Sequence, residues 1–231
     1  MFVLALGIFL FSYLLRFATV EAGAPRAMPN AIDIVLFSIF ALHHSVFARE
    51  RVRAWVTRHV PPGLERSFYV WIASVLLIAV VLLWQPVGGV AWHVEGWAWW
   101  LLHALQLWGA WLTFRSAAII DVFDLAGVRQ AGTAVAGDLP LDSARGRQVS
   151  GQEFKTTGPY GWVRHPIYSG WFLLMFGVGT MTGTRLVFAA ISCLYVLIAI
   201  PFEERSLLAT TRGAYNRYVN QVKWKLLPGV Y

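Results

Sequence analysis

The sequence predicts an all-α fold: a polytopic membrane bundle of about six helices, five to six of them spanning, with a C-terminal helical hairpin. Three observations predict it. Hydrophobic residues make up 58% of the 231 residues and charged residues only 13%, whereas soluble domains average about 45–50% and about 25%. Long uncharged runs separate the charged stretches, and the basic residues gather in alternate stretches. The single cysteine, Cys193, excludes an internal disulfide.

The uncharged runs place the membrane helices, because about 20 mainly apolar residues cross a hydrocarbon core about 30 Å thick. The candidates, in chain order, are residues 1–15, 34–48, a stretch within 67–94, 96–114, 165–184 and 186–202. The first run could instead be a cleaved signal peptide, but it lacks a positively charged start, so we predict a helix. The last two runs are joined by the short sequence TMTGTR, which predicts a tight helical hairpin. Either both of its members span the bilayer, or they are shorter helices packed together.

The basic residues predict the orientation and argue against nucleic-acid binding. Residues 49–66 hold five arginines, residues 85–96 hold no Lys or Arg, and residues 115–164 and 203–231 are again basic. Six crossings with both termini in the cytoplasm satisfy the positive-inside rule. The net charge of +7 is spread over these stretches, and acidic residues are interspersed in the middle one. We therefore expect an integral protein of a bacterial inner membrane, with the lipid bilayer rather than nucleic acid as its partner.

We predict one integral membrane domain over residues 1–231. Its N-terminal part, residues 1–121, holds four helices, and residues 122–164 form a cytoplasmic loop. The hairpin and tail at residues 165–231 form a cofactor site. A connection as long as this loop is usually functional or mobile.

Polar residues near membrane depth are costly, so their positions are informative. The outward and returning members of the hairpin have similar lengths, which brings the segment Arg164 to Tyr168 close to Glu203 and Glu204. Pro166 suits the first turn of a helix, whose free N–H groups can bind an anionic group. The two glutamates could hold an ammonium group or accept from ribose hydroxyls. This combination predicts a pocket for a zwitterionic cofactor that carries a nucleoside.

Two simpler interpretations stay open for these polar residues. Arg-His-Pro before a helix can be an interfacial charge cluster that sets topology, and Glu-Glu-Arg can be a solvated helix end. The adjacent pair His43 and His44 does not share a helix face, and the other histidines are scattered, so we expect no metal site. Cys193 is expected to be a small packing residue in an apolar helix.

The segment GPYGWVRHPIYSGW, followed by EERSL and GAYNRY, resembles the C-terminal half of isoprenylcysteine carboxyl methyltransferase-like membrane enzymes. Upstream, HHSVFARERVRAWVTRHVP, LERSFYVWIASVLL, LWQPVG and FDLAGVRQ resemble the methanethiol S-methyltransferase and NnrU-related branch. Together these segments cover nearly the whole chain. Ala199 stands where isoprenylcysteine enzymes carry an arginine that orients the substrate carboxylate, which argues against a prenylcysteine substrate.

The resemblance implies an enzyme that uses S-adenosyl-L-methionine as methyl donor, bound from the cytoplasm. The cofactor contacts that it implies are Gln152, Glu153, Phe154, Lys155, Tyr160, His165, Pro166, Ile167, Tyr168 and Glu203, and the hairpin argument adds Arg164 and Glu204. The acceptor is expected to be a small lipophilic thiol such as methanethiol. His43, His44 or Asp124 could aid its deprotonation. Open alternatives are a lipid or prenylated carboxylate acceptor, a non-catalytic NnrU-like membrane protein, and a transporter; the oligomeric state stays open.

Overall fold

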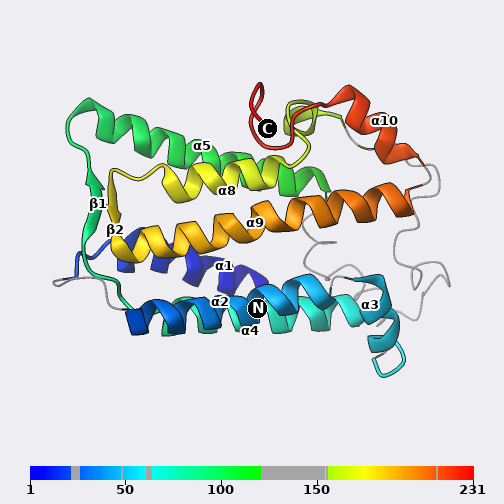
Figure 1. Cartoon of the computed structure of the whole chain (residues 1–231), viewed down its shortest axis with the longest axis horizontal. Coiled ribbons are helices and arrows are strands. Elements are labelled where there is room, and N and C mark those ends of the chain that lie inside the picture. Colours follow the sequence, from blue (N-terminus) through cyan, green and yellow to red (C-terminus); the bar gives the residue numbers. More distant parts are fainter. Residues whose placement is uncertain (22–26, 48, 61–63, 121–153, 155, 212) are drawn as a thin grey trace. The chain divides into compact units, whose positions relative to one another are not determined.

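The computed structural model describes residues 1–21, 27–47, 49–60, 64–120, 154, 156–211 and 213–231, and it is mostly helical (Figure 1). The described residues divide into two compact units. Residues 1–94 and 180–192 form the first unit, and residues 95–120, 154–179 and 193–231 form the second unit. The predicted cytoplasmic loop falls almost wholly outside the described residues.

The first unit contains α1 (Phe2–Phe11), a π-helical turn η1 (Ser12–Arg16), α2 (Ala27–Phe47), α3 (Glu50–Val56) and α4 (Glu65–Leu83). Both α1 and α2 pack against α4. Aromatic rings fill the centre of this unit, because Phe9, Tyr13, Phe17 and Trp84 all lie within about 6 Å of the Phe188 ring. Such ring pairs add stability beyond the area that they bury.

The side chains of Arg16 and Asp33 both form hydrogen bonds with the peptide group between Trp84 and Gln85, directly after α4. The Arg16 guanidinium donates to the carbonyl oxygen of Trp84 at 3.2 Å and to that of Val81 at 2.8 Å. The N–H of Gln85, on the other side of the same peptide bond as the Trp84 carbonyl, donates to Asp33 Oδ1 at 2.8 Å. The bonds from Arg16 satisfy carbonyls that a helix leaves unpaired at its C-terminus. Together with the bond to Asp33 they tie η1 and α2 to the end of α4.

The all-α prediction needs one correction, since the first unit also holds a small antiparallel sheet of β1 (Val90–His93) and β2 (Thr180–Thr182). The segment expected to be a hairpin turn, TMTGTR, supplies β2 and the first turn of the next helix. Its β-branched threonines pair with a strand that contains a β-branched valine and a tryptophan, which suit extended backbone. The register places Trp92 opposite Met181.

The second unit contains α5 (Trp97–Ile120), the short 3-10 helix η2 (Gly158–Gly161), α8 (Pro166–Phe176) and α10 (Ala214–Gln221), together with most of α9 (Gly183–Thr210), whose first residues belong to the first unit. Helices α5 and α8 pack closely because glycines face each other: a Cβ on Gly109 would lie 2.6 Å from the carbonyl oxygen of Gly170. Small residues allow this approach of two backbones within membranes. Gln106 Nε2 donates to the Leu174 carbonyl at 3.2 Å across the same contact.

Among the described residues, three helical stretches are long and apolar enough to cross a membrane: residues 30–47 of α2, α4 and α9. Residues 2–16 and α8 are shorter apolar helices. The predicted run at 165–184 is thus a shorter helix that ends before Gly177. Helix α5 occupies the predicted run at 96–114 but is not among the three, since its tryptophans, His103 and Gln106 lower its hydropathy. The predicted count of six crossings stays a prediction.

Candidate functional site

The site begins where α8 starts and α9 ends, within the second unit. His165 is the N-cap of α8, and Pro166 is its first residue, a position where proline's missing N–H costs no helical hydrogen bond. Glu203 and Glu204 lie within α9, which continues through Pro201 to Thr210. His165 Nε2 lies 3.2 Å from Glu204 Oε1, and His165 Nδ1 lies 3.8 Å from Glu203 Oε2. The structure thus brings together the imidazole and the two carboxylates, as the hairpin argument expects.

Arg164 fastens the C-terminal segment to the hairpin. Its Nε donates to Glu204 Oε1 at 2.7 Å, and its NH1 donates to the carbonyl oxygens of Val222 at 3.0 Å and Lys223 at 2.6 Å. The backbone N–H of Arg164 donates to Trp224 O at 2.8 Å. The side chain is only 6% exposed, so these bonds occupy most of its donors and leave it little freedom to bind a ligand.

The carboxylate of Glu204, like the guanidinium of Arg164, is engaged by several partners. One oxygen, Oε1, accepts hydrogen bonds from Arg164, from His165 and from the Tyr215 hydroxyl at 3.0 Å. The other oxygen lies 4.0 Å from Lys225 Nζ. A half-buried carboxylate with this many donors holds the fold of the site together, and we infer that Arg164 and Glu204 position the neighbouring groups.

Glu203 differs from its neighbour because it is open to solvent. Its side chain is 44% exposed, against 14% for Glu204. Its Oε2 accepts a hydrogen bond from the Tyr168 hydroxyl at 2.9 Å. The Tyr168 ring is stacked on the imidazole of His165 with an interplanar angle of 8°. Glu203 therefore presents an accessible negative charge beside two flat side chains that hold its position.

Aromatic side chains from α10 and the segment before η2 form a second wall. The Phe154 ring stacks on Tyr218 at 5.5 Å and meets Tyr215 edge-on at 5.2 Å. Tyr218 donates its hydroxyl hydrogen to the backbone oxygen of Tyr160 at 2.8 Å. Burial raises the pKa of Tyr218 to about 12. Burial, and then the Glu204 charge, raise the pKa of Tyr215, so both phenols stay protonated donors at neutral pH.

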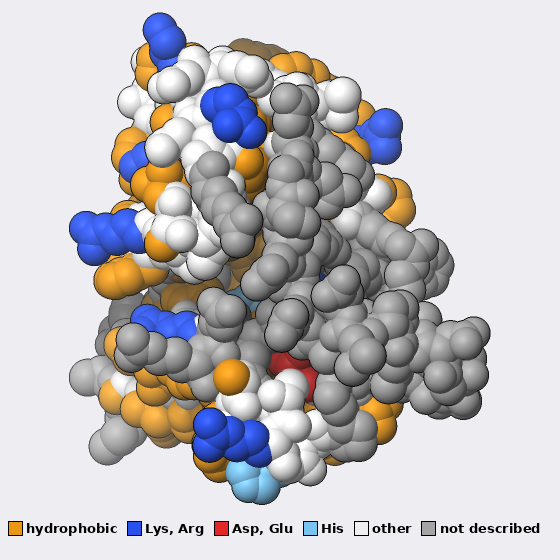
Figure 2. Space-filling model, turned by 90° about the vertical axis from the view of Figure 1, so that its right-hand side faces the viewer, with side chains coloured by type: hydrophobic (Ala, Val, Ile, Leu, Met, Phe, Trp, Pro, Cys, Tyr) orange, Lys and Arg blue, Asp and Glu red, His pale blue; other side chains and the backbone are white. Residues whose placement is uncertain are grey.

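Basic side chains surround this end of the second unit. Arg205, Arg217, Lys223 and Lys225 lie in or after the last part of α9. Figure 2 looks onto the end of the described structure at which α9 ends, and Lys and Arg side chains project from it. A basic end is typical of the cytoplasmic face of a membrane protein.

The candidate histidines of the first unit both contact Tyr69 of α4. The Tyr69 hydroxyl lies 2.8 Å from His44 Nδ1. The His43 ring is stacked between Phe47, at 4.7 Å, and Tyr69, at 5.5 Å. Both ring nitrogens of His43 are buried and have no hydrogen-bond partner among the described residues. A buried imidazole without partners is unusual, so His43 is the better candidate for a group that meets a ligand.

Four residues of the predicted site, Asp124, Gln152, Glu153 and Lys155, lie outside the described residues. Two features of the site were not assigned from the sequence. Tyr215 and Tyr218 belong to the GAYNRY segment that carries part of the resemblance, but no role was predicted for them. Their spacing of three residues, which puts them on one face of α10, is a signal that could have been used. The carbonyl oxygens that hold Arg164 carry no sequence signal, because every residue has one.

The comparisons with known proteins show the family of this chain. The phospholipid methyltransferase family model matches residues 144–214, which include the whole of α8 and of α9. Methanethiol S-methyltransferase 2 of Bradyrhizobium diazoefficiens is 35% identical over 206 residues, which are 88% of this chain and 76% of that protein. The chain belongs to the methanethiol S-methyltransferase family. Its relative in Mycobacterium tuberculosis, also a methanethiol S-methyltransferase, is 36% identical over 89% of this chain and 81% of its own length.

Membership of this family confirms the resemblance seen in the sequence and shows that the protein is an enzyme, a membrane methyltransferase. Human nurim is also similar, at 30% identity over 78% of this chain and 68% of nurim. No solved structure matches the chain.

Proposed function

We propose that this methyltransferase transfers the methyl group of S-adenosyl-L-methionine to a small thiol such as methanethiol. One observation carries the proposal: the exposed carboxylate of Glu203, braced by Tyr168 beside His165, in a chain similar over most of its length to methanethiol S-methyltransferases. When bound, S-adenosyl-L-methionine supplies a methyl group already activated on a sulfonium. The protein then needs chiefly to align the two sulfur atoms and exclude water.

Some of the residues present are suited to bind a zwitterionic nucleoside, and others hold those residues in position. Glu203 is suited to accept hydrogen bonds from ribose hydroxyls or from an ammonium group. Tyr160 and Tyr168 offer flat, hydroxyl-bearing side chains near Glu203, and Phe154 offers a flat ring against Tyr215 and Tyr218. Pro166 and Ile167 form the first turn of α8. Arg164 and Glu204 are paired with each other, and their role is to hold these residues in position. Gln152, Glu153 and Lys155 remain part of the proposed site on the strength of the resemblance alone.

We further propose that the cofactor site and both termini face the cytoplasm of a bacterial cell, with the protein in the inner membrane. The basic residues that follow α9 support this orientation, since such residues are retained on the cytoplasmic side. The single membrane domain of about six helices belongs to the same proposal.

A direct experiment tests the proposal with the full chain in detergent micelles. Calorimetry with S-adenosylhomocysteine is expected to show saturable binding, and gas chromatography is expected to detect dimethyl sulfide when methanethiol and S-adenosyl-L-methionine are supplied together. A folded preparation that binds no S-adenosylhomocysteine would overturn the cofactor assignment. Binding without dimethyl sulfide would overturn the acceptor alone.

A lipid acceptor is the second candidate, and one observation favours it: the family model that matches residues 144–214 is named for phospholipid methylation. Incubation with a radiolabelled methyl donor and membrane lipids, followed by chromatography, separates the two. Label in the lipid fraction, with none in volatile sulfide, would favour the lipid.

We propose His43 as the group that accepts the thiol proton, because both of its ring nitrogens are buried and unpartnered among the described residues. His44 is less suited, since Tyr69 already bonds its Nδ1, and Asp124 stays a candidate from the sequence. Replacing His43 with glutamine is expected to lower kcat about 100-fold or more at pH 7, as removal of a general base does. The loss shrinks as the pH rises toward the pKa of the thiol, because a larger fraction of the acceptor then ionises without help.

The control for this prediction is His59→Gln, which changes an exposed histidine after α3. We expect it to leave the rate unchanged at every pH, and both variants to bind S-adenosylhomocysteine as the wild type does. A His43→Gln enzyme that loses activity equally at all pH values would contradict the role of proton acceptor.

A further inference from the structure

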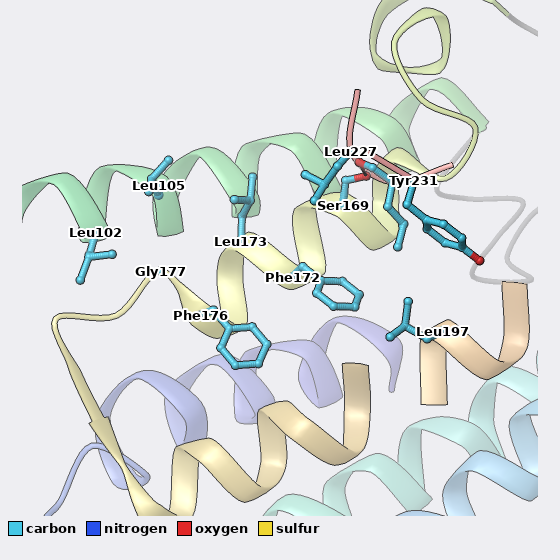
Figure 3. Close-up of a pocket in the computed structure, with 11 residues that line it drawn as sticks. Leu102, Leu105, Ser169, Phe172, Leu173, Phe176, Gly177, Leu197, Leu227 and Tyr231 are labelled. Carbon is cyan, nitrogen blue, oxygen red and sulfur yellow. Dashed lines mark hydrogen bonds between the residues drawn. The ribbon is translucent and has the colours of Figure 1, made fainter. Parts of the chain in front are cut away.

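The second unit contains an apolar cavity that the proposed chemistry does not use. Its volume is about 480 Å³. Figure 3 shows its walls: Leu102 and Leu105 come from α5, Phe172 and Phe176 from α8, and Leu197 from α9. Residues near the C-terminal end of the chain complete the wall. None of the described side chains that line it carries a charge.

The cavity adjoins the polar cluster through a shared wall. Ser169, which lines the cavity, follows Tyr168 in α8, and its hydroxyl donates to the Leu226 carbonyl at 2.6 Å. Leu226 also lines the cavity and forms a core cluster with Val196 and Ile200, against which Tyr168 packs. The same Tyr168 donates its hydroxyl hydrogen to Glu203. One tyrosine thus has its ring against the apolar core beside the cavity and its hydroxyl in the proposed cofactor site.

The chemistry of the walls indicates a hydrocarbon occupant. The two polar side chains in the wall, Ser169 and Tyr231, are already hydrogen-bonded, because Ser169 donates to Leu226 and the Tyr231 hydroxyl accepts from Lys225 Nζ at 3.0 Å. A ligand with polar groups would therefore find few partners here. The volume lies in the range of about 300–1,000 Å³ that takes a drug-sized ligand, far more than a single methyl group fills.

We propose that this cavity receives the alkyl chain of a thiol acceptor, so that the enzyme also methylates straight-chain alkyl thiols of about six carbons. This inference rests on the proposed function and names its substrate class. The deprotonated sulfur forms a bond to the methyl carbon of the donor while the bond from that carbon to the donor's sulfonium sulfur breaks. The bonding pair stays on the donor sulfur, and the thiol proton has already passed to a base or to water. The products are an alkyl methyl sulfide and S-adenosylhomocysteine.

The test compares two cavity-filling variants with a matched control. Leu105→Trp and Leu197→Trp place an indole in the cavity from α5 and from α9. The control, Leu107→Trp, adds the same side chain to α5 at a position that is 71% exposed and does not line the cavity. Each protein is assayed in the same detergent with methanethiol and with hexanethiol, and the measured quantity is the ratio of the two kcat/KM values. Partition of hexanethiol into micelles affects every variant alike and cancels between proteins.

We expect the ratio of hexanethiol to methanethiol kcat/KM to fall at least about tenfold in both filled variants, because one methylene in an apolar pocket is worth about 10–200-fold. The control is expected to keep the wild-type ratio. Equal ratios in all four proteins, or a wild type that methylates methanethiol but not hexanethiol, would overturn the proposal. The proposal would also be overturned if native mass spectrometry showed that the protein retains a phospholipid which hexanethiol does not displace.

A binding measurement separates this inference from the proposed function. Fluorine NMR with trifluorohexanethiol is expected to show a bound resonance in the wild type and in Leu107→Trp, and none in Leu105→Trp or Leu197→Trp. A bound resonance without methylation of either thiol would mean that the thiol methyltransferase assignment fails while the alkyl site stands. A resonance that persists in both filled variants would place the alkyl chain elsewhere.

Discussion

Replacing Glu203 with glutamine is expected to weaken the binding of S-adenosylhomocysteine by about tenfold to hundredfold. Glutamine keeps the shape and the hydrogen bond to Tyr168, but it removes the negative charge that the accessible oxygen offers to a ligand. A hydrogen bond to a charged group contributes about 1.5–3 kcal/mol, and each 1.4 kcal/mol is a factor of about ten in affinity. Calorimetry with the detergent-solubilised protein measures the change.

The fold should not change in this variant, because Glu203 is 44% exposed and makes one hydrogen bond in the site. The melting temperature of Glu203→Gln is therefore expected to match that of the wild type. The control Glu21→Gln alters an exposed glutamate of the first unit, and it should leave both affinity and melting temperature unchanged. Wild-type affinity in Glu203→Gln would show that this carboxylate is only a solvated helix end.

The second large effect is expected in stability, on replacing Arg164 with methionine. The change leaves Glu204 without its closest partner and leaves the carbonyls of Val222 and Lys223 without a donor. Removing one member of a buried pair costs about 3–5 kcal/mol, which corresponds to a fall of roughly 10 °C in melting temperature for a chain of this size. Thermal unfolding, followed by circular dichroism in detergent, measures it.

Arg164→Lys should recover little of this stability, since an ammonium group cannot reproduce the fork that donates to a carboxylate and to two carbonyls at once. Amide hydrogen exchange at residues 222–226 should accelerate in both variants, because this segment loses side-chain hydrogen bonds that Arg164 donates to its carbonyls. Arg217→Met, on the exposed face of α10, is the control and should leave exchange unchanged. Slow exchange at residues 222–226 in Arg164→Met would contradict the fastening role.

The sequence predicted the hairpin and its polar cluster because both follow from spacing. Two apolar runs with a short connection must return to the same side of the bilayer, so Arg164 and His165 had to approach the glutamates. Spacing alone could not separate Glu203 from Glu204, since adjacent identical residues carry the same chemistry, and only the resemblance implied Glu203 as the cofactor contact. Their roles differ because one faces Arg164 and Tyr215 and the other faces solvent. The rotation of α9 about its own axis decides which residue takes which side.

The two-stranded sheet was missed for a related reason. Val90–His93 and Thr180–Thr182 are each too short to show an alternating pattern, and they pair across about ninety residues of chain. Short strands gain stability from cross-strand neighbours rather than from their own sequence. The prediction of a simple turn at TMTGTR had no access to that partner.

By itself, the sequence determined that the chain is apolar enough for a membrane, that its last apolar runs fold back on each other, and that an Arg-His-Pro-x-Tyr segment meets two glutamates. Composition and the spacing of charges are properties of the linear sequence, so they can be read without a three-dimensional structure. Only the tertiary structure decided that Arg164 holds backbone carbonyls and that Glu203 alone of the pair is open. It also decided that His43 has no hydrogen-bond partner among the described residues and that an apolar cavity lies beside Tyr168. Each of these depends on atoms distant in sequence, whose approach is set by side-chain packing.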